Sequence, residues 1–175
     1  QIRDFESEIQ TLTNQLKNKN TEHEKLESFR ETLQKTYDEL AVKKLIGYLP
    51  ENTPLYNEMY IREFLDFVGE IYQVSNLKDR IDEVIKQVGL TPEQHKKIGT
   101  LSKGYKQRVG LAQAIIHNPE VLILDEPTTG LDPNQLVEIR DLIKNIGKDK
   151  TVFLSTHIMQ EVEAICDRVI IIDKG

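Results

Sequence analysis

The spacing of hydrophobic residues changes near residue 41. Before that point apolar residues recur at intervals of three or four, and after a polar interruption at 17–20 the stripe resumes over residues 26–40. The first part of the stripe consists of Ile2, Phe5, Ile9, Leu12 and Leu16. Such spacing is typical of helices that share one apolar seam. We therefore predict a coiled-coil-like segment over residues 1–40, either as one long helix or as two helices joined by a polar turn.

After residue 41, short apolar runs alternate with segments of helical spacing. The runs predict strands at 44–49, 121–125, 151–155 and 168–172. The helical spacing predicts helices at 60–72, 77–88, 103–117, 134–146 and 158–165. Ser102 is placed to cap one of these helices, and Gly89 follows another where a positive φ is often needed. Strands that alternate with helices indicate an α/β domain with a mostly parallel sheet, over residues 41–175.

Two adjacent carboxylates follow the apolar strand at 121–124. Asp125 and Glu126 come at the carboxyl end of this strand, which is the edge where open α/β sheets place their ligands. One carboxylate can hold Mg²⁺ while its neighbour positions a water for phosphoryl chemistry. A plain core strand that ends in a turn is the simpler interpretation, since Pro127, Gly130 and Pro133 are ordinary turn residues.

Three further motifs favour the chemical interpretation. Leu-Ser-Lys-Gly-Tyr-Lys-Gln-Arg occupies residues 101–108, Gly-Leu-Asp occupies 130–132, and a second apolar strand at 151–155 leads to His157. Together with the acidic strand, this order resembles the ATP-binding subunits of ABC transporters: signature motif, Walker B, D-loop and switch histidine. The segment at 46–51 resembles the family's Q-loop, and residues 52–60 look closest to ABC-2-type exporters, including the gliding-motility type.

The resemblance implies a role for each acidic or histidine position. Asp125 would hold Mg²⁺ through water, and Glu126 would orient the attacking water and accept its proton. His157 would sense the γ-phosphate, and Asp132 would bridge two subunits at the D-loop. Glu51 stands where the family commonly has Gln, so a full charge replaces a neutral amide.

The signature residues are implied to bind ATP held by the opposite subunit of a head-to-tail dimer. Ser102 and Gly104 lie at a helix start, where backbone N–H groups favour a phosphate, and Lys103 adds a positive charge. The helical subdomain at about 60–100 is implied to contact an integral membrane subunit. These expectations place the protein on the cytoplasmic face of the membrane, with ATP and Mg²⁺ as ligands.

The composition narrows the possible partners. A net charge of −6 argues against a nucleic-acid partner, since such binding rests on many Lys and Arg contacts with phosphate. The single cysteine, Cys166, excludes a disulfide within the chain, and we see no run long enough to span a bilayer.

A P-loop, Gly-x-x-x-x-Gly-Lys-Ser/Thr, is not found in residues 1–175. We therefore expect a partial P-loop NTPase core of ABC type that lacks its Walker A lobe and C-terminal tail and follows an unrelated helical segment. Such a chain would by itself bind and hydrolyse ATP poorly, unless a partner supplied the P-loop in trans.

The function we predict is that of an ATP-hydrolysing subunit that drives transport by a separate membrane subunit. Two alternatives stay open. The first is a coiled-coil assembly protein with a degenerate ATPase domain. The second is the signature and Walker B half of a coiled-coil ATPase of DNA maintenance, although its Q-loop would precede the coiled coil, whereas Glu51 follows it here.

Overall fold

A computed structural model describes residues 17, 19, 21, 23–28, 30, 34 and 39–172. The chain divides into two units, residues 1–42 and residues 43–175. In the first unit, the residues that are described are helical. The apolar seam expected at residues 2–16 lies outside the described residues, and the coiled coil expected over residues 1–40 stays a prediction.

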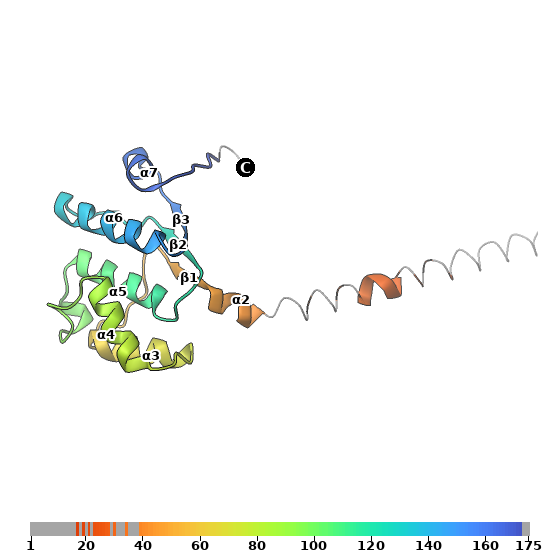
Figure 1. The fold of residues 1–175 in the computed structure, drawn as a ribbon, viewed down its shortest axis with the longest axis horizontal. Coiled ribbons are helices and arrows are strands. Elements are labelled where there is room, and N and C mark those ends of the chain that lie inside the picture. Colours follow the sequence, from red (N-terminus) through yellow and green to blue (C-terminus); the bar gives the residue numbers. More distant parts are fainter. Residues whose placement is uncertain are drawn as a thin grey trace, which may run out of the picture. The chain divides into compact units, whose positions relative to one another are not determined.

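The second unit alternates helices with strands, as expected for an α/β domain (Figure 1). Its elements are α2 (Glu39–Leu45, which begins in the first unit), β1 (Ile46–Leu49), α3 (Ile61–Ile71), α4 (Leu77–Gln87), a 3₁₀ turn (Ile98–Thr100), α5 (Lys103–Ile115), β2 (Val121–Asp125), α6 (Pro133–Gly147), β3 (Thr151–Ser155) and α7 (Met159–Ile165). Most bounds agree with the predicted ones to within two residues. The first strand is shorter than expected, because α2 continues through Leu45.

The sheet has three described strands, in the order β1-β2-β3, and both pairs are parallel. Leu124 of β2 lies opposite Leu49 of β1 and Leu154 of β3. The carboxyl ends of the three strands therefore meet at one edge. The central strand is anchored in the core, since its Leu122 and Leu124 are both fully buried.

Helices α3, α4 and α5 form one group near β1, and α6 and α7 lie toward β3 (Figure 1). The core between these elements consists of aliphatic side chains and Phe64. Two predicted helix ends are confirmed. The Ser102 hydroxyl accepts a hydrogen bond from the Tyr105 N–H at the start of α5, and Gly89 adopts a φ of +71° after α4.

The prediction of a strand at residues 168–172 is wrong, as far as the structure describes these residues. Residues 169–172 form neither helix nor strand, and Ile170, Ile171 and Ile172 are 82–83% exposed. An apolar run favours a strand locally, but a strand is stable only when another strand pairs with it. Residues 168–172 pair with none of the described strands.

Helix α5 approaches β1 closely at Gly47. A Cβ atom added to Gly47 would lie 2.1 Å from the backbone oxygen of Ala114 and 2.9 Å from side chains of Leu122 and Pro119. A backbone atom cannot move aside as a flexible side chain can. Only glycine therefore lets the first strand lie this near α5, the helix whose first turns carry the signature motif.

We predict that Gly47→Ala lowers the free energy of unfolding by about 1–3 kcal/mol, because the added methyl overpacks this contact. Urea denaturation followed by circular dichroism measures the change. Gly147→Ala is the matched control, since its Cβ would find only a side-chain atom of Val152 at 3.7 Å. An unchanged midpoint for Gly47→Ala would show that β1 and α5 are not held this close.

Candidate functional site

Glu126 is the centre of a small hydrogen-bonded cluster at the carboxyl end of β2. Its N–H donates to the Ser155 carbonyl at 2.9 Å, so the pairing between β2 and β3 extends one residue beyond the strands. Glu126 has a φ of +48°, which is unusual for a residue with a side chain. This conformation ends the extended backbone of β2. The backbone therefore turns at Glu126 while staying attached to β3.

Two neighbours hold the Glu126 carboxylate. His157 donates to Oε1 twice, from its backbone N–H at 3.0 Å and from ring atom Nδ1 at 2.7 Å. Thr129 donates its hydroxyl to Oε2 at 3.0 Å. The Glu126 side chain is 15% exposed, whereas the His157 side chain is 76% exposed. His157 can therefore leave the carboxylate without disturbing the core.

These contacts determine the protonation of Glu126. Burial raises the pKa of this carboxyl, but the hydrogen bonds from His157 and Thr129 outweigh burial and hold the pKa below its ordinary value. Glu126 is thus a carboxylate at neutral pH, with each oxygen accepting at least one hydrogen bond.

Asp125 is the last residue of β2 and lies opposite Ser155 of β3. It is half-buried and adjoins a second carboxylate in Glu126. Within the described residues, no three His, Cys, Asp or Glu side chains converge as a metal cluster would require. A single carboxylate is a ligand set that Mg²⁺ can use, since this cation keeps several waters and takes few protein ligands.

The signature residues lie at the start of α5. Ser102 and Lys103 are exposed, and Gly104 is buried against α6. A Cβ atom added to Gly104 would lie 2.6 Å from the Gln135 side chain, so the glycine makes room for Gln135. The Ser102 oxygen accepts from Tyr105 and keeps its own proton available to a ligand.

Lys103 reaches across to the D-loop turn. Its Nζ occupies the place where a Cβ on Gly130 would be, at 2.1 Å from that position. Asp132 follows two residues later and caps α6, since its Oδ1 accepts from the N–H groups of Asn134 and Gln135 at 3.0 Å each. The signature segment and the D-loop turn are therefore in contact through Lys103 and the first turn of α6.

The structure thus places the predicted residues in two groups. Asp125, Glu126 and His157 lie together at the sheet edge, and Ser102, Lys103 and Gly104 lie beside the turn that contains Asp132. Glu51 is exposed in the loop after β1 and forms no hydrogen bond or ion pair with either group. The roles in nucleotide binding stay predictions for all eight positions.

Sequence reasoning missed Thr129. The turn at 127–130 was interpreted only as a turn, yet a hydroxyl three residues after a carboxylate can reach back to it across that turn. It also missed the support beneath His157. Arg140 of α6 donates to both oxygens of the fully buried Glu161 of α7, at 2.9 and 2.5 Å, which fixes the helix that follows His157.

His117 lies outside both groups. Its ring stacks on Tyr72 with centroids 4.0 Å apart, and its Nε2 lies 3.1 Å from the Ile46 carbonyl. Burial lowers the pKa of His117; the hydrogen bond with the Ile46 carbonyl raises it in part, and the nearby Lys150 and Arg80 lower it. These contacts give His117 a structural place between α3, α5 and β1.

The family is established by comparison with known proteins. The model of the ABC transporter family matches residues 6–129. The chain therefore belongs to the ABC transporter ATP-binding protein family. The match begins at residue 6 and includes most of residues 1–40, which counts against the unrelated origin expected for that segment.

Individual relatives agree with this assignment. An uncharacterized ABC transporter ATP-binding protein of Bacillus subtilis, YxlF, is 43% identical over 135 residues, which cover 76% of this chain and 46% of the relative. The bacitracin transport ATP-binding protein BcrA of Bacillus licheniformis is 41% identical over 152 residues, covering 86% of this chain and 49% of the relative. The linearmycin resistance ATP-binding protein LnrL of Bacillus subtilis is 40% identical, covering 76% and 44%. The chain spans about half the length of these curated relatives.

We predict that Thr129→Val and His157→Ala each raise the pKa of Glu126 toward its ordinary value, because each variant removes a donor to the charged form. Carbon-detected NMR titration of the Glu126 carboxyl measures the change. Thr100→Val is the matched control, since that hydroxyl donates to Lys97 instead. The same Glu126 pKa in all three variants would contradict the cluster.

Proposed function

We propose that this chain is part of the ATP-hydrolysing subunit of an ABC transporter. The observation that carries the proposal is the placement of Asp125, Glu126 and His157 at the joined ends of β2 and β3. The family and its relatives support the class of function. The relatives are named as an ABC transporter, a bacitracin transport and a linearmycin resistance ATP-binding protein, which favours this function over assembly alone or DNA maintenance.

In this proposal the chain's own residues position a water and move a proton. Glu126 orients the attacking water and accepts its proton, which requires that a lone pair on one carboxylate oxygen be free. One lone pair of Oε1 becomes free when the exposed His157 ring turns away, while the His157 backbone N–H stays on Oε1 and the Thr129 hydroxyl stays on Oε2. His157 then turns toward the phosphate. When bound, Mg²⁺ at Asp125 supplies charge neutralisation for the phosphate oxygens.

The signature residues act on a second nucleotide. Ser102 and Lys103 are exposed at the start of α5 and are available to a phosphate carried by another ATP-binding subunit in a head-to-tail dimer. Asp132 lies in the adjoining turn and would face the same partner. Lys103 contacts the turn at Gly130. This contact supports the proposal that the signature segment and the turn move together when the partner subunit binds.

We place the protein on the cytoplasmic face of the membrane, where an integral membrane subunit receives the motion through the helical subdomain. The membrane part belongs to the partner in this proposal. Across the described residues, no helix combines the length and the apolar character that a membrane crossing requires.

Residues 1–175 contain no Walker A sequence, and so the chain alone should bind Mg-ATP weakly. We predict that millimolar Mg-ATP shifts the amide NMR signals of residues at the ends of β2 and β3. The dependence of these shifts on Mg²⁺ should disappear in Asp125→Asn, because the carboxylate that holds the cation is lost. Glu126→Gln should keep the shifts, since it leaves Asp125 in place.

Asp141→Asn on α6 is the control for the loss of one negative charge, and its response to Mg-ATP should match that of the parent chain. Shifts that are absent, that centre on other elements, or that persist unchanged in Asp125→Asn would contradict the proposed site.

A further inference from the structure

Helix α7 is attached to the domain mainly through one ion pair. Of its seven residues only Glu161 is buried, and the side chain of this glutamate is 1% exposed. Arg140 of α6 donates to both Glu161 oxygens, from Nε at 2.9 Å and from Nη2 at 2.5 Å. Across the described residues, no other side chain forms a hydrogen bond or ion pair with the Glu161 carboxylate. A charged pair thus stands where contacts between helices usually have apolar side chains.

Apolar packing contributes little to this attachment. Ile165, the last residue of α7, packs against the core but is only partly buried. Met159, the first residue of α7, is 62% exposed. Helix α6 is the element that α7 contacts most. Glu161 is therefore the main anchor of the first turn of α7.

The buried carboxylate cannot stay in place without its partner. A carboxylate that is removed from water is costly unless hydrogen bonds and an opposite charge compensate it. Arg140 supplies both, and its own side chain is 22% exposed. If the guanidinium is lost, Glu161 must move toward water, and the first turn of α7 must move with it. The position of α7 therefore depends on Arg140.

His157 lies in the short connection between β3 and α7. Strand β3 ends at Ser155, and α7 begins at Met159. The His157 side chain is 76% exposed, and among the described residues it bonds to Glu126 alone. Because the ring is not packed into the core, its direction follows from the backbone at the two ends of this connection. Pairing with β2 fixes the first end, and the position of α7 fixes the second.

We propose that Arg140 and Glu161 are positioning residues for His157. By holding α7 on α6, the pair fixes the second end of the connection and keeps Nδ1 of His157 on the Glu126 carboxylate. Arg140 and Glu161 act through the backbone that follows the histidine, and neither of them bonds to Glu126. That this position of His157 serves ATP hydrolysis rests on the proposed function.

The test determines which nitrogen of the His157 ring carries the proton, by nitrogen NMR of the full chain at pH about 8, where a histidine ring is neutral. In the parent chain we expect the proton on Nδ1, because Nδ1 lies 2.7 Å from a carboxylate oxygen that only accepts. Glu126→Ala removes this acceptor and gives the reference signals of a ring without it. Arg140→Gln and Glu161→Ala should each shift the ring signals toward that reference.

The two variants separate position from charge. Arg140→Gln removes a positive charge and Glu161→Ala removes a negative one, so an effect through the electric field would have opposite signs. A loss of position predicts the same change in both variants. Glu161→Ala is also the milder change for the fold, because the partly exposed Arg140 side chain can turn to water.

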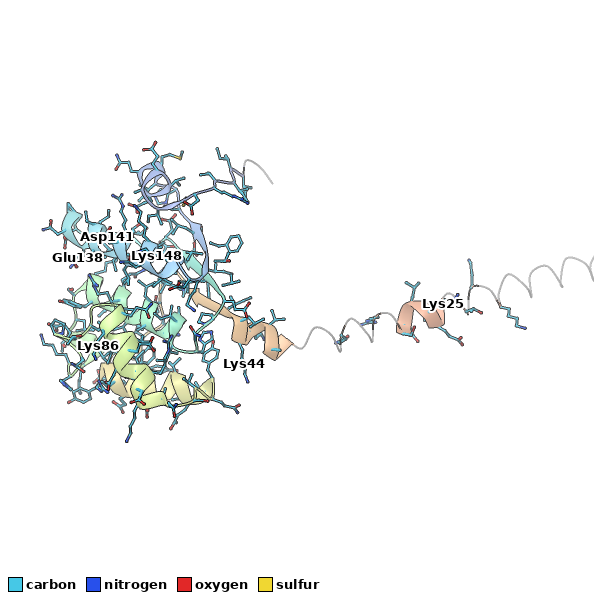
Figure 2. All side chains as sticks on the ribbon, in the orientation of Figure 1. Lys25, Lys44, Lys86, Glu138, Asp141 and Lys148 are labelled. Atoms are coloured by element: carbon cyan, nitrogen blue, oxygen red, sulfur yellow. The ribbon has the colours of Figure 1, made fainter. Side chains whose placement is uncertain are left out.

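Hydrogen exchange of the Glu126 amide shows whether the sheet edge survives in these variants. This N–H donates to the Ser155 carbonyl, so its protection should stay at the level of the parent chain. The matched control is Glu138→Ala, which removes an ion pair that α6 forms with Arg108 of α5 instead of with α7 (Figure 2 labels Glu138). The His157 signals of this control should equal those of the parent chain.

Several results would overturn the proposal. One is a folded Arg140→Gln or Glu161→Ala variant whose His157 signals equal those of the parent chain. Others are opposite changes in the two variants, or a change that Glu138→Ala shares. Loss of the Glu126 amide protection, or of the circular dichroism signal, in both variants would also overturn it, since the pair would then hold the whole domain rather than the histidine.

This experiment and the Mg-ATP titration fail independently. The nitrogen NMR measurement contains no nucleotide, so His157 can keep its signals in both variants while Mg-ATP still shifts the sheet edge. That result would refute the positioning role and leave the proposed function intact. The reverse result, a displaced histidine in a chain that does not respond to Mg-ATP, would refute the proposed function and leave the positioning role intact.

Discussion

The parallel pairing of β2 with β3 is the constraint on which the rest of the site depends. Asp125 lies opposite Ser155, and the Glu126 N–H continues the ladder to the Ser155 carbonyl. Glu126 and His157 are more than thirty positions apart in the sequence. The pairing therefore brings Nδ1 of His157 to 2.7 Å from Oε1 of Glu126. A shift in register would separate the carboxylate from the histidine, even if every strand still formed.

Helix α6 joins this edge to the signature segment. The turn that begins at Glu126 ends at Asp132, whose side chain caps α6. Gln135, in the first turn of that helix, fills the space that Gly104 leaves open. At its other side, α6 holds α7 through Arg140 and Glu161. One helix thus fixes the positions of the D-loop turn, the start of α5 and the helix that follows His157.

The sequence was sufficient where local pattern and tertiary structure agree. The strands at 121–125 and 151–155 could be predicted residue by residue, since each is an apolar run bounded by turns. The strand at 168–172 could not be judged in the same way, because pairing depends on neighbours that a local pattern does not contain. Gly104 shows the same limit within the site: its position suggested a phosphate, and the structure adds a packing reason in Gln135. Thr129 required knowledge of how the turn folds back on Glu126.

A double-mutant cycle between Glu126→Ala and His157→Ala tests the central claim most directly, with free energies of unfolding obtained from urea denaturation. We predict that the two changes are not additive and that the coupling is about 0.5–1 kcal/mol, a modest value because His157 is largely exposed. Additive effects would contradict the account, since they would mean that β3 does not bring His157 to the carboxylate at the end of β2.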